Sequence, residues 1–152
     1  MIDIQFDVLE KTRIKILDSI KDLTIDQINT IPDKFNNNIA WNFAHLIVTQ
    51  QLLCYKFSGL DCHIDEKSIN MYRKGTAPNS KMTLEEFQKY KELFLLNVER
   101  IKDDYNKGRF KTYNTYTTSA NVTLASIEDA IAFNNMHEGI HLGSILALKK
   151  VI

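Results

Sequence analysis

The sequence lacks the features that mark membrane, secreted or nucleic-acid-binding proteins. Its 2 cysteines are too few for a disulfide framework, and no apolar run approaches the roughly 18 residues of a membrane span. Lysine plus arginine equals aspartate plus glutamate, 19 against 19, so no surplus of charge favours nucleic acid or an anionic membrane. The segment 1–7 lacks the basic start of a signal peptide. We therefore expect a cytoplasmic protein that binds neither membranes nor nucleic acid.

What the 152 residues do contain is helical periodicity. This length suits one domain, 1–152, that buries roughly two-thirds of the surface of its unfolded chain. Apolar residues recur at three- and four-residue steps, and no repeat or low-complexity tract interrupts them. The pattern predicts four helices, at about 4–20, 40–57, 83–105 and from between 123 and 126 to about 150. The long connections between the last three favour an all-α fold, a four-helix bundle with long crossover connections.

Two of the helix starts have clear local signals. Thr83 with Glu86, and Ser126 with Asp129, have the spacing of a capping box, in which each side chain bonds the backbone N–H of the other residue. The segment 110–122, rich in threonine and tyrosine, favours at most a short extended piece. We therefore expect the last two helices to begin just after Thr83 and near Ser126.

The most informative motif is His137-Glu138-Gly139-Ile140-His141 in the last helix. Side chains four residues apart lie one turn above each other, so His137 and His141 can reach the same metal ion. The pattern matches the HExxH of zinc proteases, in which the glutamate is the general base. Those enzymes take a third ligand downstream, but the segment 142–152 contains no His, Asp, Glu or Cys. The protease interpretation therefore fails, and a third ligand must come from upstream.

His45 is the candidate for that third ligand. It lies in a largely apolar helical stretch, 39–48, where an imidazole needs a partner. Helical spacing places it on one stripe with Trp41, from which it can face His137 and His141 across the core. Three neutral imidazoles would leave a coordination position open, as catalytic zinc sites do. The alternative is that each histidine is only a hydrogen-bonded core residue.

The two segments that carry these histidines resemble the DinB-like superfamily of metal-binding four-helix bundles. Asn37 to Leu46 is similar to the start of the second helix of that family, and Phe133 to Gly143 is similar to its last helix. The segment 58–125 matches only in its pattern of helix and loop. The resemblance implies one divalent ion, Zn, Ni, Fe or Mn, bound by His45, His137 and His141. Family members include hydrolases, and transferases and isomerases that use a low-molecular-weight thiol.

Several polar residues near the histidines are candidates for supporting roles. Glu138 is offset by about 100° from His137, and without the protease context we expect it to hydrogen-bond a ligand or to lie at the surface rather than to act as a base. We expect His63 to be an exposed loop residue. Four others lie within about a turn of a histidine and can orient it or touch a substrate: Asn42, Thr49, Asn134 and Ser144.

Gly139, Gly143 and Ala147 form a stripe of small residues on the last helix, rotated by about 200° from His137. Each glycine inside a helix costs about 1 kcal/mol relative to alanine, which suggests a compensating close approach. A neighbouring helix of the same chain or a second copy across a two-fold axis can provide it. We favour the second copy, a homodimer.

Two functions from different classes fit these observations. The first is a metal-dependent enzyme, a thiol transferase or a hydrolase, in which the ion lowers the pKa of a water or of a substrate thiol for reaction with a small molecule. The second is a metal- or ligand-binding bundle without turnover, related to stress. Turnover that a chelator abolishes distinguishes the first from the second.

Overall fold

The computed structural model describes residues 2–152, so Met1 of the expected domain 1–152 lies outside the described residues. The prediction of an all-α fold is confirmed, because the described part is mostly helical with one small two-stranded sheet. It contains six α-helices rather than the predicted four, since two short helices lie in the connections. The helices are α1 Ile2–Ile20, α2 Ile25–Asn29, α3 Ile39–Gln50, α4 Glu66–Tyr72, α5 Leu84–Asn106 and α6 Ile127–Lys149. Between residues 2 and 152, no helix combines the length and the apolar character that crossing a membrane requires.

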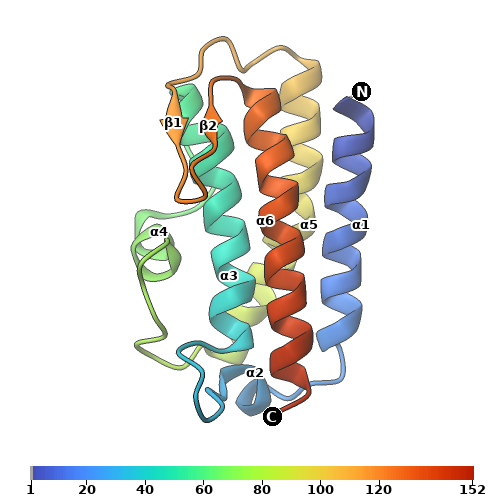
Figure 1. Cartoon of the computed structure of the whole chain (residues 1–152). Coiled ribbons are helices and arrows are strands. Elements are labelled where there is room, and N and C mark those ends of the chain that lie inside the picture. Colours follow the sequence, from blue (N-terminus) through green and yellow to red (C-terminus); the bar gives the residue numbers. More distant parts are fainter. Residues whose placement is uncertain (1) are drawn as a thin grey trace.

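The four long helices, α1, α3, α5 and α6, lie side by side (Figure 1). Helix α6 packs against α1 and α3, and α5 packs against the same two helices. Asn38 Nδ2 donates to the Asn29 carbonyl, and Asn29 Nδ2 donates to the Met82 carbonyl, which brings the starts of α3 and α5 to one end of the molecule. The neighbours α3 and α5 are therefore parallel, and parallel neighbours require a long crossover such as the segment 59–83.

The connection from α5 to α6 contains the only two strands in the described part. Strands β1 (Tyr116–Thr117) and β2 (Thr123–Leu124) pair antiparallel, with Tyr116 opposite Leu124. The expected short extended piece at 110–122 therefore contains β1, and β2 lies just beyond it.

Both expected N-caps are present. The Thr83 hydroxyl accepts from the Glu86 N–H, and the Glu86 carboxylate accepts from the Thr83 N–H, which completes the capping box at the start of α5. Ser126 accepts from the Asp129 N–H at the start of α6, but the Asp129 carboxylate accepts from Ala125 rather than from Ser126. Both helices therefore begin where the sequence predicts.

The expected second helix, 40–57, consists of three kinds of helix. Helix α3 ends at Gln50, a π-helix follows at Gln51–Tyr55, and a 3-10 turn at Lys56–Ser58 precedes Gly59. Gly59 has a φ of +72°, the left-handed conformation that glycine adopts at the lowest cost. The wide π turn allows two consecutive glutamines to point inward, and both are fully buried. Wide turns of this kind are frequent at functional sites.

The core consists of two apolar halves with a polar layer between them. One half includes Ile16, Phe43, Phe94 and Ile145, and the other includes Leu9, Leu53, Ile101 and Ile131. Along each long helix, a buried polar side chain lies between the two halves: Arg13 on α1, Gln50 on α3, Asn97 on α5, and Asn134 and Glu138 on α6. Buried polar groups must find partners, so this layer restricts how the four helices can align.

Candidate metal centre

The structure brings the three predicted histidines together between α3 and α6. His45 comes from α3 and is 4 % exposed, whereas His137 and His141 come from one face of α6 and are partly buried. One nitrogen from each imidazole lies within 4.8 Å of the others. Three nitrogen donors around one point are a set that can hold a divalent ion.

His45 is fixed by contacts at one nitrogen and on one ring face. Its Nδ1 donates to the Tyr72 carbonyl at 2.6 Å, since a carbonyl can only accept. Tyr72 ends the short helix α4, which therefore positions this carbonyl. The indole of Trp41 stacks on the imidazole, with ring centroids 4.5 Å apart and planes 12° from parallel. With its proton held on Nδ1, His45 presents the lone pair of Nε2 toward His137.

Asn42 orients His141 in the same way. The Asn42 side-chain nitrogen donates to the Asn38 carbonyl at 2.8 Å, so its oxygen accepts from His141 Nδ1 at 2.7 Å. This bond leaves the Nε2 lone pair of His141 for a ligand. Asn38 is also the N-cap of α3, so the start of that helix fixes the second imidazole.

His137 completes the group. Its Nε2 is 3.2 Å from Nε2 of His45, and its buried Nδ1 has no hydrogen-bond partner among residues 2–152. Two ligands of one tetrahedral zinc ion, each at about 2.0–2.1 Å from the metal, lie about 3.3 Å apart. The observed separation of the two nitrogens therefore fits imidazoles that share one ion.

All three histidines are neutral at physiological pH. Burial, together with the repulsion of the other two imidazoles, lowers the pKa of His137 to about 3. Burial and the repulsion of His45 lower the pKa of His141 to about 4. Burial lowers the pKa of His45 as well, against the opposing effect of its bond to Tyr72. A histidine must be neutral to bind a metal, so each is in the form that a ligand needs.

A cavity of about 530 Å³ opens beside the three histidines, which all line it. The cavity is bordered by α3 with its π-helix, by α6, by the β1–β2 hairpin and by the loop at 74–75. Its apolar lining includes Trp41, Leu52, Phe57 and Phe133. Small-molecule sites typically have this size and this apolar character. A small molecule held in the cavity can therefore reach the histidine nitrogens.

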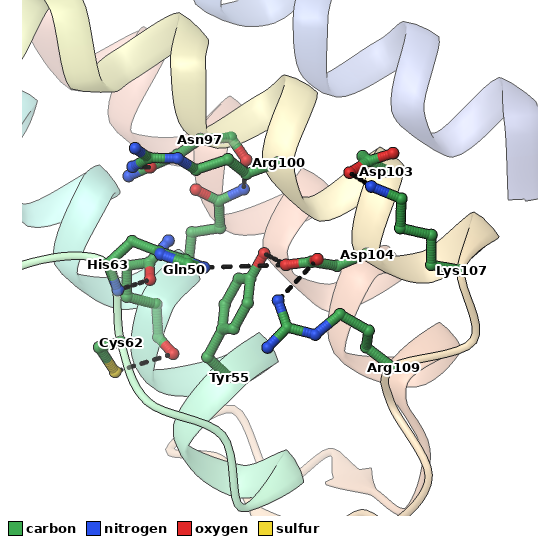
Figure 2. A network of polar contacts seen from close by, with 11 residues as sticks. Gln50, Tyr55, Cys62, His63, Asn97, Arg100, Asp103, Asp104, Lys107 and Arg109 are labelled. Carbon is green, nitrogen blue, oxygen red and sulfur yellow. Dashed lines mark hydrogen bonds and ion pairs between the residues drawn. The ribbon is translucent and has the colours of Figure 1, made fainter.

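A second polar network ties the end of the π-helix to the end of α5 (Figure 2). Tyr55 donates to one oxygen of Asp104 at 2.8 Å, and Arg109 donates to the other at 2.9 Å. Burial would raise the pKa of Asp104, but the bonds from Arg109 and Tyr55 outweigh it and hold that pKa below its ordinary value. The network fixes the start of the segment that leads to the β1–β2 hairpin at the cavity.

His63 lies in a loop as expected, but it is partly buried rather than exposed. Its backbone N–H donates to the Gln51 side chain at 2.8 Å, which draws the loop inward. The imidazole is partly buried, packs edge-on against Tyr55, and has its Nε2 at 3.7 Å from Asp104. His63 therefore belongs to the second network and not to the histidine group.

Glu138 has neither of the roles expected of it. It is 0 % exposed, and its carboxylate accepts from Arg13 Nη2 at 2.6 Å and from Arg13 Nε at 3.2 Å. Arg13 also donates to the Phe94 carbonyl at 2.6 Å. Among residues 2–152, no hydrogen bond joins Glu138 to any of the three histidines. The expected surface position or ligand contact is wrong, because the buried guanidinium compensates the carboxylate charge within the core.

Of the four polar residues expected near the histidines, the two on α3 contact them and the two on α6 do not. Asn42 holds its imidazole as described, and Thr49 Oγ1 lies 3.3 Å from His45 Nε2. Asn134 Nδ2 donates instead to the Glu138 carboxylate, and the Ser144 hydroxyl donates to the Ile140 carbonyl of the same helix. Of these four residues, only the two on α3 therefore support the site, together with the Tyr72 carbonyl of α4.

Sequence reasoning missed four residues that shape this region: Arg13, Tyr72, Lys56 and Lys74. Arg13 had a signal, because it interrupts the apolar stripe of α1, and a charge at such a position needs a buried partner. Tyr72 acts through its backbone carbonyl, which leaves no signal in the identity of the side chain. Lys56 lies in the 3-10 turn and Lys74 lies in a loop, so neither belongs to the helical stripe that carries a histidine.

One protein family matches most of the chain. Its sequence model, described as the DinB superfamily, matches residues 9–145. The matched region includes the three clustered histidines and both members of the buried ion pair. No curated protein matches the chain significantly.

Proposed function

The chain belongs to the DinB superfamily, and we propose that it is an enzyme that depends on a divalent metal ion held by His45, His137 and His141. The ion is Zn, Ni, Fe or Mn, and the substrate is a small molecule in the adjoining cavity. When bound, such an ion supplies Lewis acidity that lowers the pKa of a water or of a thiol. The observation that carries the proposal is the arrangement of neutral imidazoles around one point beside that cavity.

The number of ligands supports a catalytic rather than a structural ion. Structural zinc sites close with four protein ligands, whereas catalytic sites keep a position for water or substrate. Among residues 2–152, the group that can hold an ion contains three histidines and no carboxylate or cysteine. Cys54 is buried elsewhere, where burial raises the pKa of its thiol well above its ordinary value. A fourth position would therefore fall to a molecule in the cavity.

The absence of a base favours a thiol transferase over a hydrolase. Hydrolases that activate water commonly use a carboxylate or histidine as general base. Glu138 is committed to Arg13, and among the described residues that line the cavity none is acidic. A thiol loses its proton on binding a metal without such a base. The same absence also favours the second candidate, a metal- or ligand-binding bundle without turnover that acts under stress.

Metal analysis joined to a screen for activity tests the proposed function. The purified protein should contain one divalent ion per chain, and His137→Ala should lack it, whereas the matched variant His63→Ala should retain it. The protein should then accelerate the reaction of a small thiol, such as glutathione or cysteine, with an electrophile such as 1-chloro-2,4-dinitrobenzene. A chelator should abolish the acceleration. Tight metal without turnover across such thiols would favour the binding module.

We also propose that two copies of the chain associate through the outer face of α6. A methyl group at Gly139 or Gly143 would meet no atom within 4 Å, so no neighbouring helix of the same chain explains these glycines. The exposed positions of α6 from 132 to 147, all of them described, carry no charged side chain. They include Ile140, which is 56 % exposed, and Met136, which is 43 % exposed. An apolar strip of this kind marks an interaction surface.

The strip is complementary to itself in the antiparallel direction. With a two-fold axis between positions 141 and 142, the large Ile140 lies opposite Gly143, and the large Met136 lies opposite Ala147. The first turn of α6 is acidic and its last residues are basic, so antiparallel copies direct the acidic end of one helix toward the basic end of the other. A parallel arrangement would instead place like charges together.

Sedimentation or light scattering at about 100 µM tests the homodimer. The native chain should have twice the mass of one chain, and Gly143→Arg should have the mass of one. Leu96→Glu on α5 is the matched control, because Leu96 is also an exposed apolar residue of a long helix and should leave the dimer intact. A native chain that sediments as a monomer would contradict the proposal.

A further inference from the structure

The cavity beside the histidines has charge of one sign only. Lys56 and Lys74 line it, and no acidic residue lies among the described residues of its lining. Both lysines are exposed, and within residues 2–152 neither forms an ion pair with an aspartate or glutamate. Since the three histidines are neutral, the lining of the cavity carries two cations and, among the described residues, no anion. An anion that enters it meets attraction and no opposing charge.

The two lysines reach the cavity from different elements, Lys56 from the 3-10 turn and Lys74 from the loop at 74–75. Lys74 lies two positions after Tyr72, whose carbonyl holds His45. Lys56 lies 11 positions after His45 along one helical rod, which corresponds to at most about 16 Å at 1.5 Å per residue. A long side chain reaches back over part of this distance. An anionic group at Lys56 would therefore be separated from the histidines by the length of an extended small molecule.

Apart from Thr49, the wall between His45 and Lys56 is apolar. Leu52 and Phe57 line the cavity from the π-helix and the 3-10 turn, and Phe133 lines it from α6. The Phe57 ring stacks on Tyr116 of β1, with centroids 4.4 Å apart and planes 22° from parallel, which fixes the ring as part of the wall. A surface of this kind stabilises an apolar body by removing it from water.

We infer that the cavity selects an elongated amphiphilic anion, with an apolar body along Leu52 and Phe57 and an anionic group paired with Lys56 or Lys74. The inference rests on the proposed function in taking this cavity as the substrate site. A carboxylate, sulfonate or phosphate at the cavity mouth keeps part of its hydration while it pairs with an ammonium group. A neutral molecule of the same shape gains the apolar contact without the charge contact, so the sign of the charge determines selectivity.

A matched pair of dyes tests this inference. 8-Anilinonaphthalene-1-sulfonate and N-phenyl-1-naphthylamine share one apolar body and differ by the sulfonate. Each is titrated into metal-loaded and chelator-treated protein, and energy transfer from Trp41, the single tryptophan, reports dye bound near the cavity that Trp41 lines. The sulfonate dye should bind at least ten-fold more tightly. Lys56→Gln combined with Lys74→Gln should weaken it about ten-fold and leave the neutral dye unchanged.

Two controls fix the interpretation. Lys102→Gln removes an exposed lysine of α5 that does not line the cavity, and it should leave both dyes unaffected. Lys56→Arg combined with Lys74→Arg should restore binding of the sulfonate dye. Equal affinity for the two dyes, or a change below three-fold in the double glutamine variant, would overturn the inference. Lysine-dependent dye binding in a native chain that cannot be loaded with any divalent ion would instead overturn the proposed function and leave the charge selectivity standing.

Discussion

The two sides of α6 differ in charge: one carries neutral histidines, and the other carries a buried ion pair. Toward α3, His137 and His141 are neutral imidazoles beside a cavity. Toward the interior, Glu138 and Arg13 are both 0 % exposed and neutralise each other. One residue and about 100° of helix rotation separate His137 from Glu138. The same short motif therefore contributes to two sites with different requirements.

The difference lies in which polar atoms are left without partners. On the interior side, Arg13 bonds the Glu138 carboxylate and the Phe94 carbonyl and also lies over the Phe94 ring at 4.4 Å, so the pair is closed to other ligands. On the cavity side, His45 and His141 have their Nδ1 atoms occupied, while their Nε2 lone pairs face the shared point, where His45 Nε2 also lies 3.3 Å from the Thr49 hydroxyl. Satisfied groups indicate a structural role, and convergent available donors indicate a ligand. The glutamate of the motif is therefore structural in this chain.

The largest expected effect is on stability. Glu138→Ala leaves the Arg13 charge buried without a partner, and we expect it to lower the free energy of unfolding by about 3–5 kcal/mol. Chemical denaturation of chelator-treated protein measures this effect without a contribution from metal. His141→Ala under the same conditions should lower the free energy of unfolding far less, because it removes a partly buried neutral group.

A double replacement separates charge from packing on the interior side. Arg13→Met combined with Glu138→Leu removes both charges and keeps apolar volume, and we expect stability within about 2 kcal/mol of the native chain. A cost below about 1 kcal/mol for Glu138→Ala alone would show that the buried pair does not hold α1 and α6 together.

The next effect belongs to the cavity side. A metal that binds only the folded chain stabilises it by about 2.7 kcal/mol at a free concentration of 100 times Kd. Denaturation with metal and with chelator should show this difference for the native chain and for His63→Ala. The difference should vanish for His45→Ala and for His141→Ala. Equal melting temperatures despite confirmed metal loading would mean that no ion bridges α3 and α6.

A smaller effect is expected at Asn42, which bonds His141 but is not one of the three proposed metal ligands. Asn42→Ala removes the acceptor that holds the proton of His141 on Nδ1, and we expect metal affinity to fall about 10–100-fold. Competition with a chelator of known affinity measures the change. Asn135→Ala is the matched control, since Asn135 bonds Gln5 and should leave the affinity unaltered. An unaltered affinity for Asn42→Ala would show that the bond to His141 does not tune the site.

The smallest effect is the pH dependence of the metal-free protein. His137 and His141 have folded pKa values of about 3 and about 4, below about 6.5 in an unfolded chain. The unfolded state therefore binds more protons between about pH 4 and pH 6.5, so stability must decrease as the pH is lowered through that window. One unit below pH 6.5, each imidazole should cost about 1 kcal/mol. Thermal melts of the chelator-treated native chain and of His137→Gln between pH 7 and 5 measure this loss of stability. Identical dependence of stability on pH in the two proteins would contradict the lowered pKa of His137.

The periodic and capping signals of the sequence predicted the long helices well. Thr83 and Ser126 begin α5 and α6 because each satisfies a backbone N–H that the first turn leaves free. The expected helix at 40–57 was correct in extent, but the π turn within it, where Gln50 and Gln51 are buried, depends on tertiary packing that the local pattern does not encode. Helix α4 was missed because it is short and its role at His45 depends on a carbonyl.

At the site, the spacing of His137 and His141 predicted a shared face because helix geometry is local. The partner of Glu138 could not follow from that spacing, since Arg13 lies 125 positions away in the sequence and meets it only through tertiary packing. The interrupted apolar stripe of α1 was the available signal. Lys56 and Lys74 approach one cavity only after the crossover has placed the loop at 74–75 beside α3.

The most direct test of the central claim is X-ray absorption at the metal edge, recorded for the native chain and for Arg13→Met combined with Glu138→Leu. The claim is that three histidines bind the ion and that the glutamate of the motif does not. Both proteins should give the same spectrum, with scattering from three imidazoles whose nitrogens lie at about 2.0–2.1 Å if the ion is zinc. A spectrum with fewer than three imidazoles in the native chain, or a ligand lost in the double variant, would contradict the claim.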